Sequence, residues 1–334
     1  MGHARTALVL LLGVCALALS SCGGGGSSTP GAAATSKPVG TVVEYATTST
    51  NADPVNMSVG PDGALWFIES PGGGGANKLG RVSTSGVLTE YAMPAGVLFP
   101  GGLVTGPDHN LWFTDEANHL IMSTTGGTMT VYNAGATLED LVVGPDNNLW
   151  SPEYNTSFDD AFSTSGALVH HYPTGYSQQN VYITVGPNGN LFVSGYGGIL
   201  GEMTTTGTAS QFNMNPPVVN GTRNLIVGPD ANLWIADEND NIIVKVSPST
   251  GAVLASYTVP TANGSPWGIA NGPDGNIWFT ELIGNKIARI TTSGTITEYP
   301  IPTPNAQPYW IVAGPDGNMW FTEAQSSKVG YIVP

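Results

Sequence analysis

Acidic side chains recur at one fixed place in this sequence, and their spacing indicates cation chemistry. Seven times a Gly-Pro-Asp or Gly-Pro-Asn phrase leads into an apolar segment, and the residue nine positions after its glycine is acidic in six of the seven copies. These seven residues are Glu69, Asp115, Glu153, Gly195, Asp237, Glu281 and Glu323. Carboxylate oxygens are the ligands that Ca²⁺ and Mg²⁺ prefer. If the copies surround an axis, we expect the carboxylates to lie around one shared opening.

These acids form two groups, according to whether a lysine begins the next strand of the same copy. In the first, sixth and seventh copies it begins the next strand, which predicts the ion pairs Glu69 with Lys78, Glu281 with Lys286, and Glu323 with Lys328. The other copies lack that lysine, and two of them carry a further acid. Unpaired carboxylates that gather at an opening tend to attract a cation. The candidates for a Mg²⁺ or Ca²⁺ site are therefore Asp115, Glu116, Glu153, Asp237 and Glu238.

The repeated phrase also defines the elements that hold these residues. Its glycines are Gly60, Gly106, Gly144, Gly186, Gly228, Gly272 and Gly314, spaced 46, 38, 42, 42, 44 and 42 residues apart. That period accommodates four short strands with their turns, which is typical of a β-propeller blade. Six of the eight tryptophans lie six residues after the glycine, in the middle of the second strand. We expect these rings to pack between neighbouring blades.

The two ends of the chain predict how the ring closes. The last copy has only three strands before the chain stops, and residues 40–45 (Gly-Thr-Val-Val-Glu-Tyr) resemble residues 294–299 (Gly-Thr-Ile-Thr-Glu-Tyr). Pairing this N-terminal strand with the last copy removes two exposed sheet edges. The predicted fold is all-β: a seven-bladed propeller over residues 40–334, with four antiparallel strands per blade and the N-terminal strand closing the last blade.

The first 39 residues are predicted to lie outside the ring. Arg5 precedes an apolar run that is too short to span a bilayer, and Leu19-Ser20-Ser21-Cys22 resembles the lipobox of bacterial lipoproteins. This resemblance implies a signal peptide over residues 1–21, a lipid on Cys22, a flexible tether over residues 22–39, and an extracytoplasmic protein of the bacterial cell envelope. The membrane would be contacted through that lipid only. An ordinary secretory signal is the alternative.

Charge and composition limit the classes of binding partner that we expect. Removing residues 1–21 takes away one base, Arg5, and leaves 24 acidic against 8 basic residues, a balance of −16. Such a surface disfavours nucleic acids and admits cations and cationic ligands. No nucleotide-binding loop, Ser-His-Asp phrase or zinc-type Cys/His spacing is present in the mature sequence. We expect a monomer.

Three phrases carry a resemblance to a known family. They are Gly-Pro-Asp-Gly-Asn-Ile-Trp-Phe-Thr-Glu at residues 272–281, Asn-Lys-Ile-Ala-Arg-Ile at 285–290, and Thr-Glu-Tyr-Pro-Ile-Pro-Thr-Pro-Asn at 297–305. The chain resembles the virginiamycin B lyase family, whose members inactivate streptogramin B, from about Gly40 to Pro334. The resemblance implies a Mg²⁺-assisted carbon–oxygen elimination that opens a cyclic depsipeptide. It also implies histidines at the mouth of the ring, five residues before the repeat glycine.

This chain departs from the family at that position. The seven residues are Val55, Gly101, Glu139, Val181, Arg223, Trp267 and Tyr309, and none is a histidine. The acid-Pro-His phrase that the family carries in the last blade reads Gln307-Pro308-Tyr309 here. The candidates for catalysis are then Tyr309, Glu139 and Glu323. The candidates for ligand binding are Trp267, Tyr309, Arg223 and Tyr196, the last from a blade whose second strand ends in glycines instead of an acid.

Three functions from different classes stay open. The first is a lipid-anchored module that binds a small molecule, peptide or glycan at the propeller mouth and lacks the lyase histidines. The second is a Mg²⁺-dependent lyase of the virginiamycin B type, working with Tyr309 or Glu139 as an alternative base. The third is a metal-dependent hydrolase or lactonase, for which the ring of acids is the support. The missing histidines favour the first.

Overall fold

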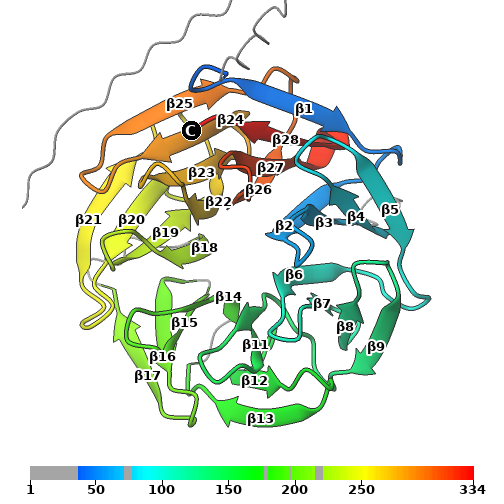
Figure 1. Ribbon diagram of the computed structural model, residues 1–334. Coiled ribbons are helices and arrows are strands. Elements are labelled where there is room, and N and C mark those ends of the chain that lie inside the picture. Colours follow the sequence, from blue (N-terminus) through cyan, green and yellow to red (C-terminus); the bar gives the residue numbers. More distant parts are fainter. Residues whose placement is uncertain (1–36, 71–76, 177–179, 196, 215–220) are drawn as a thin grey trace, which may run out of the picture. The chain divides into compact units, whose positions relative to one another are not determined.

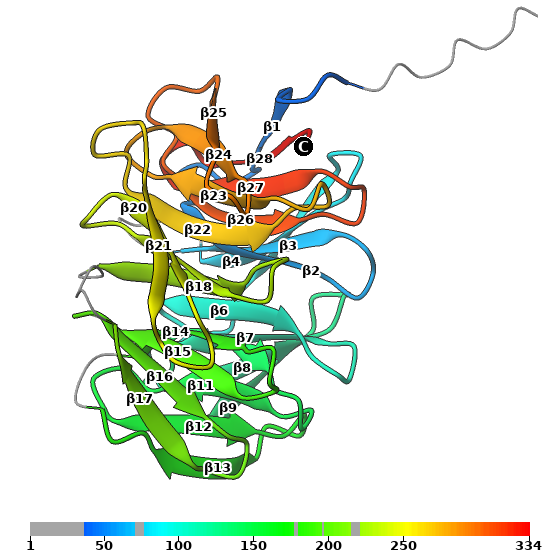
Figure 2. The same ribbon diagram turned by 90° about the vertical axis from the view of Figure 1, so that its left-hand side faces the viewer.

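Seven four-stranded antiparallel sheets surround a central axis in the computed structural model of the chain (Figure 1). The structure describes residues 37–334 apart from 71–76, 177–179, 196 and 215–220. In each sheet the first strand lies next to the axis and the fourth at the rim. Figure 2 shows inner strands such as β2, β6, β18 and β22 crossing the ring from one face to the other. Two predicted segments lie outside the described residues: the signal peptide and the tether up to residue 36. Cys22 and Tyr196 also lie outside them.

The blades follow the repeat along the sequence, with the last one shared between the two ends of the described chain. Blades 1 and 2 consist of β2 (Pro54–Val59), β3 (Leu65–Glu69), β4 (Lys78–Val82), β5 (Leu88–Ala92), β6 (Pro100–Thr105), β7 (Leu111–Asp115), β8 (His119–Ser123) and β9 (Met129–Asn133). Blades 3 and 4 consist of β10 (Val142–Val143), β11 (Leu149–Pro152), β12 (Phe158–Phe162), β13 (Leu168–Pro173), β14 (Asn180–Val185), β15 (Leu191–Gly195), β16 (Ile199–Met203) and β17 (Ala209–Asn213). Blades 5 and 6 consist of β18 (Thr222–Val227), β19 (Leu233–Asp237), β20 (Ile242–Val246), β21 (Val253–Thr258), β22 (Pro266–Asn271), β23 (Ile277–Glu281), β24 (Lys286–Ile290) and β25 (Ile296–Pro300). Blade 7 consists of β26 (Pro308–Ala313), β27 (Met319–Glu323), β28 (Lys328–Ile332) and β1 (Val42–Ala46), with the short 3₁₀ helix η1 (Ala324–Ser326) between β27 and β28.

The N-terminal strand closes the ring, as predicted. Strand β1 pairs antiparallel with β28 from Val42 opposite Ile332 to Ala46 opposite Lys328. Backbone hydrogen bonds extend the ladder at both ends, including Gly40 N–H to Val333 O at 2.8 Å. Figure 1 shows β1 beside β28 although they lie at opposite ends of the sequence. The seven-bladed, four-stranded propeller is therefore confirmed.

The glycine and the aspartate of the repeated phrase both contact the buried tryptophan of the same blade. In blade 1 the indole Nε1 of Trp66 donates to Asp62 Oδ1 at 2.9 Å, and the ring lies against Gly60, where a Cβ would come within 2.2 Å of it. The same donation recurs in every other blade that has a tryptophan at this position. All six rings are fully buried. They pack against the next blade, as Trp66 does against Leu103, which confirms the predicted packing.

A threonine of the second strand connects neighbouring blades near the mouth. Thr280 Oγ1 accepts from Gly268 N–H at 2.9 Å and donates to Tyr309 O of the next blade at 3.1 Å. Thr114 Oγ1 donates to the carbonyl of Glu139 in the same way. The inner strands are therefore held in register with one another where they reach the opening.

Across the described residues, no helix has the length and apolar character needed to cross a membrane.

Candidate functional site

A pocket opens where the inner strands reach one face of the ring. One part of it, about 190 Å³ in volume, is lined mainly by blades 1, 2 and 3, and a second part of about 290 Å³ by blades 2 to 7. The two parts share Glu116, Glu139, Tyr182 and Tyr309. A channel of about 360 Å³ lies between the inner strands, and Asp140 lines both the channel and the first part. We call the two upper parts the mouth pocket.

Aromatic rings and a guanidinium form one wall of the mouth pocket. The rings of Trp267 in β22 and Tyr309 in β26 lie with centroids 4.8 Å apart at an interplanar angle of 44°. The Arg223 guanidinium lies 4.0 Å from the Trp267 ring and pairs with Glu238 at 2.5 Å. The Trp267 indole nitrogen is buried and has no hydrogen-bond partner among the described residues. This wall can take a flat ligand group, and the Arg223 guanidinium lies beside it in the pocket lining.

Carboxyl groups form the opposite wall. Glu139 and Asp140 precede the shortened strand β10, and Glu116 follows β7. Burial, and then the nearby Glu116 and Asp140, raise the pKa of Glu139 to about 8. Burial raises the pKa of Asp140 to about 7, although the backbone N–H groups of Leu141 and Ile183 act in the opposite direction. Near neutral pH Glu139 is therefore mostly protonated, and it can donate a hydrogen bond or exchange a proton.

A break in the inner strand of six blades places two consecutive residues at the mouth. Regular strands direct neighbouring side chains to opposite faces, but the register of the inner strand shifts in six blades, as between Pro308 and Ile311 in β26. Tyr182, four residues before its repeat glycine, therefore lines the pocket with the residues five before it, and Asp140 does so in blade 3, where the inner strand is shortened to β10. Sequence reasoning named only the residues five before the glycine, because it took that position from the family resemblance. It also missed Tyr154, which lines the second part of the pocket.

The recurring acids are buried inside the blades and do not line the mouth pocket. Glu69, Asp115, Asp237, Glu281 and Glu323 are fully buried, and Glu153 is 4% exposed. Each ends its second strand or directly follows it, at the level of the mouth, as predicted. Their side chains nevertheless point into the blade interior. Glu323, a catalytic candidate, accepts from Ser326 Oγ at 2.6 Å and is not among the residues of the pocket wall.

The predicted lysine pairs are wrong. Lys78 lies opposite Glu69 in the ladder, yet its ammonium binds Glu90 of the outer strand at 2.8 Å. Lys286 likewise binds Glu298, and Lys328 binds Glu44. A long lysine stem carries its charge outwards to the fourth strand, where the glutamate lies. The inner acids instead have raised pKa values, chiefly because of burial: about 8 for Glu69 and about 7 for Glu281 and Glu323, which favours their protonated forms.

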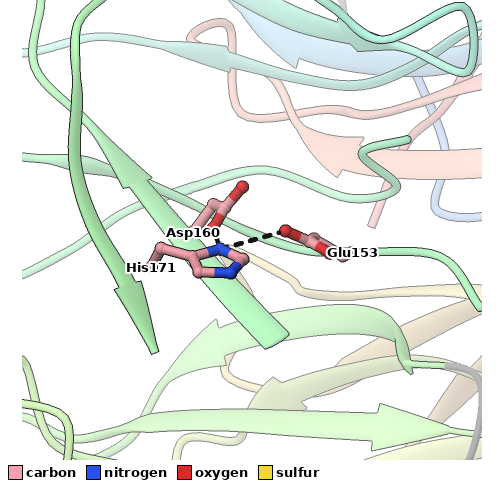
Figure 3. Close-up of side chains that lie close together, drawn as sticks. All are labelled: Glu153, Asp160 and His171. Atoms are coloured by element: carbon pink, nitrogen blue, oxygen red, sulfur yellow. Dashed lines mark hydrogen bonds and ion pairs between the residues drawn. The ribbon is translucent and has the colours of Figure 1, made fainter. Parts of the chain in front are cut away.

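The acids expected to be unpaired mostly have partners. Asp115 accepts from Phe99 N–H at 2.8 Å and contacts His119 Nδ1 at 2.9 Å. Asp237 accepts from Asp240 N–H at 3.0 Å, and Glu238 pairs with Arg223. Of the five metal candidates only Glu116 lines the mouth pocket. Glu153 belongs to a separate group with Asp160 and His171 in blade 3 (Figure 3).

Of the candidates named in the sequence, the structure thus brings together Trp267, Tyr309, Arg223, Glu139 and Glu116. No histidine is among the residues that line either part of the mouth pocket, within the portion of the chain that the structure describes. His119, His170 and His171 lie on the third or fourth strands of their blades, away from the axis. The pocket offers carboxyl and phenol groups for proton transfer in place of imidazole.

Comparison with known proteins agrees with the fold. A family model described as the virginiamycin B lyase family matches residues 30–138 and 116–334. Selenomethionine-substituted virginiamycin B lyase from Staphylococcus aureus superposes with a TM-score of 0.79 at 25% identity, over 88% of this chain and 99% of that one. A catalytically inactive variant of the same enzyme with quinupristin gives the same values.

A streptogramin B lyase structure superposes with a TM-score of 0.77 at 25% identity, over 87% of this chain and 96% of that one. The matched segments of the family model together span the whole described propeller. This chain belongs to the virginiamycin B lyase family.

Proposed function

We propose that this member of the family is a binding protein whose mouth pocket holds a small molecule or peptide with a flat apolar group and hydrogen-bond acceptors. The observation that carries the proposal is the wall of Trp267, Tyr309 and Arg223 at the positions where the family resemblance implies histidines. Aromatic and arginine side chains provide much contact area and bind flat groups well. The Arg223 guanidinium in the same lining carries only donors, which favours a ligand that supplies an acceptor.

The opposite wall supports the same ligand class. Protonated Glu139 donates to a carbonyl or hydroxyl, while Glu116 and Asp140 favour a neutral or cationic ligand over an anionic one. The volumes of the two parts of the pocket suit a ligand of modest size that is inserted by one group. The hydrolase alternative loses its support, because it depended on a ring of carboxylates facing the opening.

One observation favours lyase chemistry as the second candidate. A general base works best when its pKa is near the operating pH, and that of Glu139 is about 8. Glu139 also lines the same pocket part as Tyr309. In this alternative Glu139 takes a proton from the carbon beside the one that carries the ester oxygen; a carbon–carbon double bond forms, the carbon–oxygen bond breaks, and the ester carboxyl leaves as a carboxylate. A Mg²⁺ ion, if bound, would neutralise the charge developing on the carbonyl oxygen.

The experiment that separates the two candidates combines a ring-opening assay with calorimetry. We expect no Mg²⁺-dependent opening of quinupristin above the uncatalysed rate. A peptide and glycan panel read by calorimetry should give a ligand whose binding is weakened at least ~10-fold by Trp267→Ala. Tyr309→Phe should keep that affinity within about threefold, since it retains the ring. Efficient turnover that disappears in Glu139→Gln would instead establish the lyase.

We also propose that the protein is held at the bacterial cell envelope by a lipid on Cys22. The support is the lipobox-like phrase that ends in Cys22 and the Gly/Ser-rich stretch after it. Cys22→Ala should move the protein from the membrane fraction to the soluble fraction after cell disruption. A wild-type protein that is already soluble and unlipidated by mass spectrometry would contradict the proposal.

A further inference from the structure

Blade 3 differs from blades 1, 6 and 7 at four positions that lie side by side. In blade 1 these are Phe67, Lys78, Gly80 and Glu90, and in blade 3 they are Ser151, Phe158, Asp160 and His171. A Cβ on Gly80 would lie 2.2 Å from the Phe67 ring, so that blade has no room for a larger residue there. In blade 3 the small Ser151 creates the room that Asp160 fills. The changes are therefore sterically linked.

The new side chains converge with the acid that follows the second strand. His171 Nδ1 lies 2.7 Å from Asp160 Oδ1 and 3.2 Å from Glu153 Oε1. Figure 3 shows the three groups pointing toward one another from β12, β13 and the segment after β11. Both acids are buried, whereas the His171 side chain is 47% exposed. Solvent therefore reaches the group from the imidazole side.

When the imidazole is neutral, the two carboxyl groups of this cluster have no positively charged partner in it. A neutral imidazole carries at most one proton on Nδ1, and two carboxylates face that nitrogen. In blades 1, 6 and 7 the corresponding place has a lysine, which brings a full positive charge. Phe158 replaces that lysine in blade 3. A divalent cation bonded to all three groups would supply the missing charge.

We propose that Glu153, Asp160 and His171 form a binding site for a divalent transition-metal ion of the zinc class. The three ligand atoms lie within 4.8 Å of one another, and no other set of three or more His, Cys, Asp or Glu ligands lies this close among the described residues. Around a tetrahedral Zn²⁺ with bonds of about 2.0–2.2 Å, ligand atoms are separated by roughly 3.3 Å. The imidazole nitrogen favours Zn²⁺ over Mg²⁺ and Ca²⁺, which prefer oxygen alone.

Neighbouring residues already hold the ligands in place. The ring of Phe158 stacks on His171 at 4.1 Å with an interplanar angle of 8°, which fixes the plane of the imidazole. Thr156 Oγ1 donates to Glu153 Oε2 at 2.7 Å and leaves Oε1 directed at the group. Supporting contacts of this kind are typical of metal sites. Three protein ligands leave a fourth position for water on the exposed side.

The test is titration of metal-free, tag-free protein with ZnCl₂ by calorimetry, with the Co²⁺ form followed by its visible absorption. We expect one Zn²⁺ per chain, a higher Tm with Zn²⁺ than in EDTA, and visible bands on Co²⁺ binding. His171→Ala and Asp160→Asn should each weaken Zn²⁺ binding on the order of 100-fold and remove the Co²⁺ bands. Glu153→Gln should have the same effect. Because it preserves the side-chain shape, it serves as the test if the other two variants fold poorly.

His170→Ala is the matched control, since the neighbouring His170 stacks on Trp150 and its Nδ1 contacts Tyr172. This variant should bind Zn²⁺ like the wild type, as should Glu139→Gln in the mouth pocket. Absence of Zn²⁺ binding to the wild type would overturn the site. So would binding that persists in His171→Ala and Glu153→Gln, or an equal loss in His170→Ala.

Discussion

The aspartate of the repeated phrase holds both a turn and a buried indole. In blade 6 Asp274 Oδ1 accepts from Trp278 Nε1 at 3.0 Å and from Asn276 N–H at 3.1 Å. Asp274→Ala leaves the indole donor buried without a partner, so we expect unfolding in urea to show a loss of about 2 kcal/mol. Asp274→Asn keeps an acceptor oxygen and should lose less than ~1 kcal/mol, mainly the pair with Arg289. Equal losses in both variants would contradict this role.

The buried acids make the stability of the fold depend on pH. The folded-state pKa of Glu69 is about 8 against an ordinary value of 4.5, mainly because of burial. The folded chain therefore binds more protons than the unfolded chain between these values, and the free energy of unfolding falls as the pH rises from about 5 to 8. Glu281 and Glu323 act in the same direction. Glu69→Gln should reduce that slope and stabilise the protein by ~1 kcal/mol or more at pH 8.

Glu90 provides the control for this pH effect. The pKa of Glu90 is lowered to about 2, through hydrogen bonds from Lys78 and Ser49 that outweigh its burial. Its stabilising contribution is complete above pH 4.5 and is lost only as the pH falls toward 2. Glu90→Gln should therefore lower stability throughout pH 5 to 8 and keep most of the slope. If urea titrations give both variants the same slope, the slope does not arise from Glu69.

At the residue scale the sequence predicted positions better than partners. The places of Trp267, Tyr309, Arg223 and Glu139 follow from counting back from each repeat glycine, because the turn fixes the end of the inner strand. The inclusion of Asp140 could not be predicted, because it depends on where the backbone departs from alternation. The lysine partners were wrong for a similar reason: register gives the facing residue, and the length of a side chain decides which neighbour it binds.

At the scale of elements, the turn between the second and third strands braces the next blade. In blade 6 Asn285 has a left-handed φ of 55°; it accepts from Ala306 N–H at 2.7 Å and donates to Thr303 O at 2.9 Å. Asn285→Gly keeps the backbone conformation and removes these bonds, so we expect a loss of about 1–2 kcal/mol in urea unfolding. The exposed Asn305, with a φ of 53°, is the matched control. Asn305→Gly should change stability by less than ~0.5 kcal/mol.

Blade 3 contains a contact that the sequence did not predict. Its inner strand has two residues and its second strand ends at Pro152. The sequence gave no sign that His171 would meet Asp160, because that contact needs the register of β12 and β13. A bulge shifts that register between Ala161 and Phe162. Local patterns thus predict the strands, and the pairing between strands determines the chemistry.

At the scale of the whole molecule, one five-residue strand closes the ring. Strand β1 covers the edge of β28, its Tyr45 stacks on Trp320 at 5.9 Å, and its Glu44 binds Lys328 at 3.2 Å. Compared with a chain that begins at Lys37, a chain that begins at Thr47 loses all of these contacts and exposes a sheet edge. We expect its Tm to fall by roughly 5–10 °C, since the strand contributes several kcal/mol and each kcal/mol lost lowers Tm by about 1.5–2 °C in a domain of this size.

Adding the missing strand back tests closure directly. A peptide of residues 37–48 should bind the shortened chain by pairing with β28 and restore most of the lost Tm. The same peptide with Val43→Pro should fail, because proline removes a backbone donor in the middle of the ladder and fits poorly in a paired strand. If the shortened chain melts at the same temperature as its longer counterpart, β1 does not hold the ring closed. If the proline peptide restores Tm as well, the recovery does not come from strand pairing.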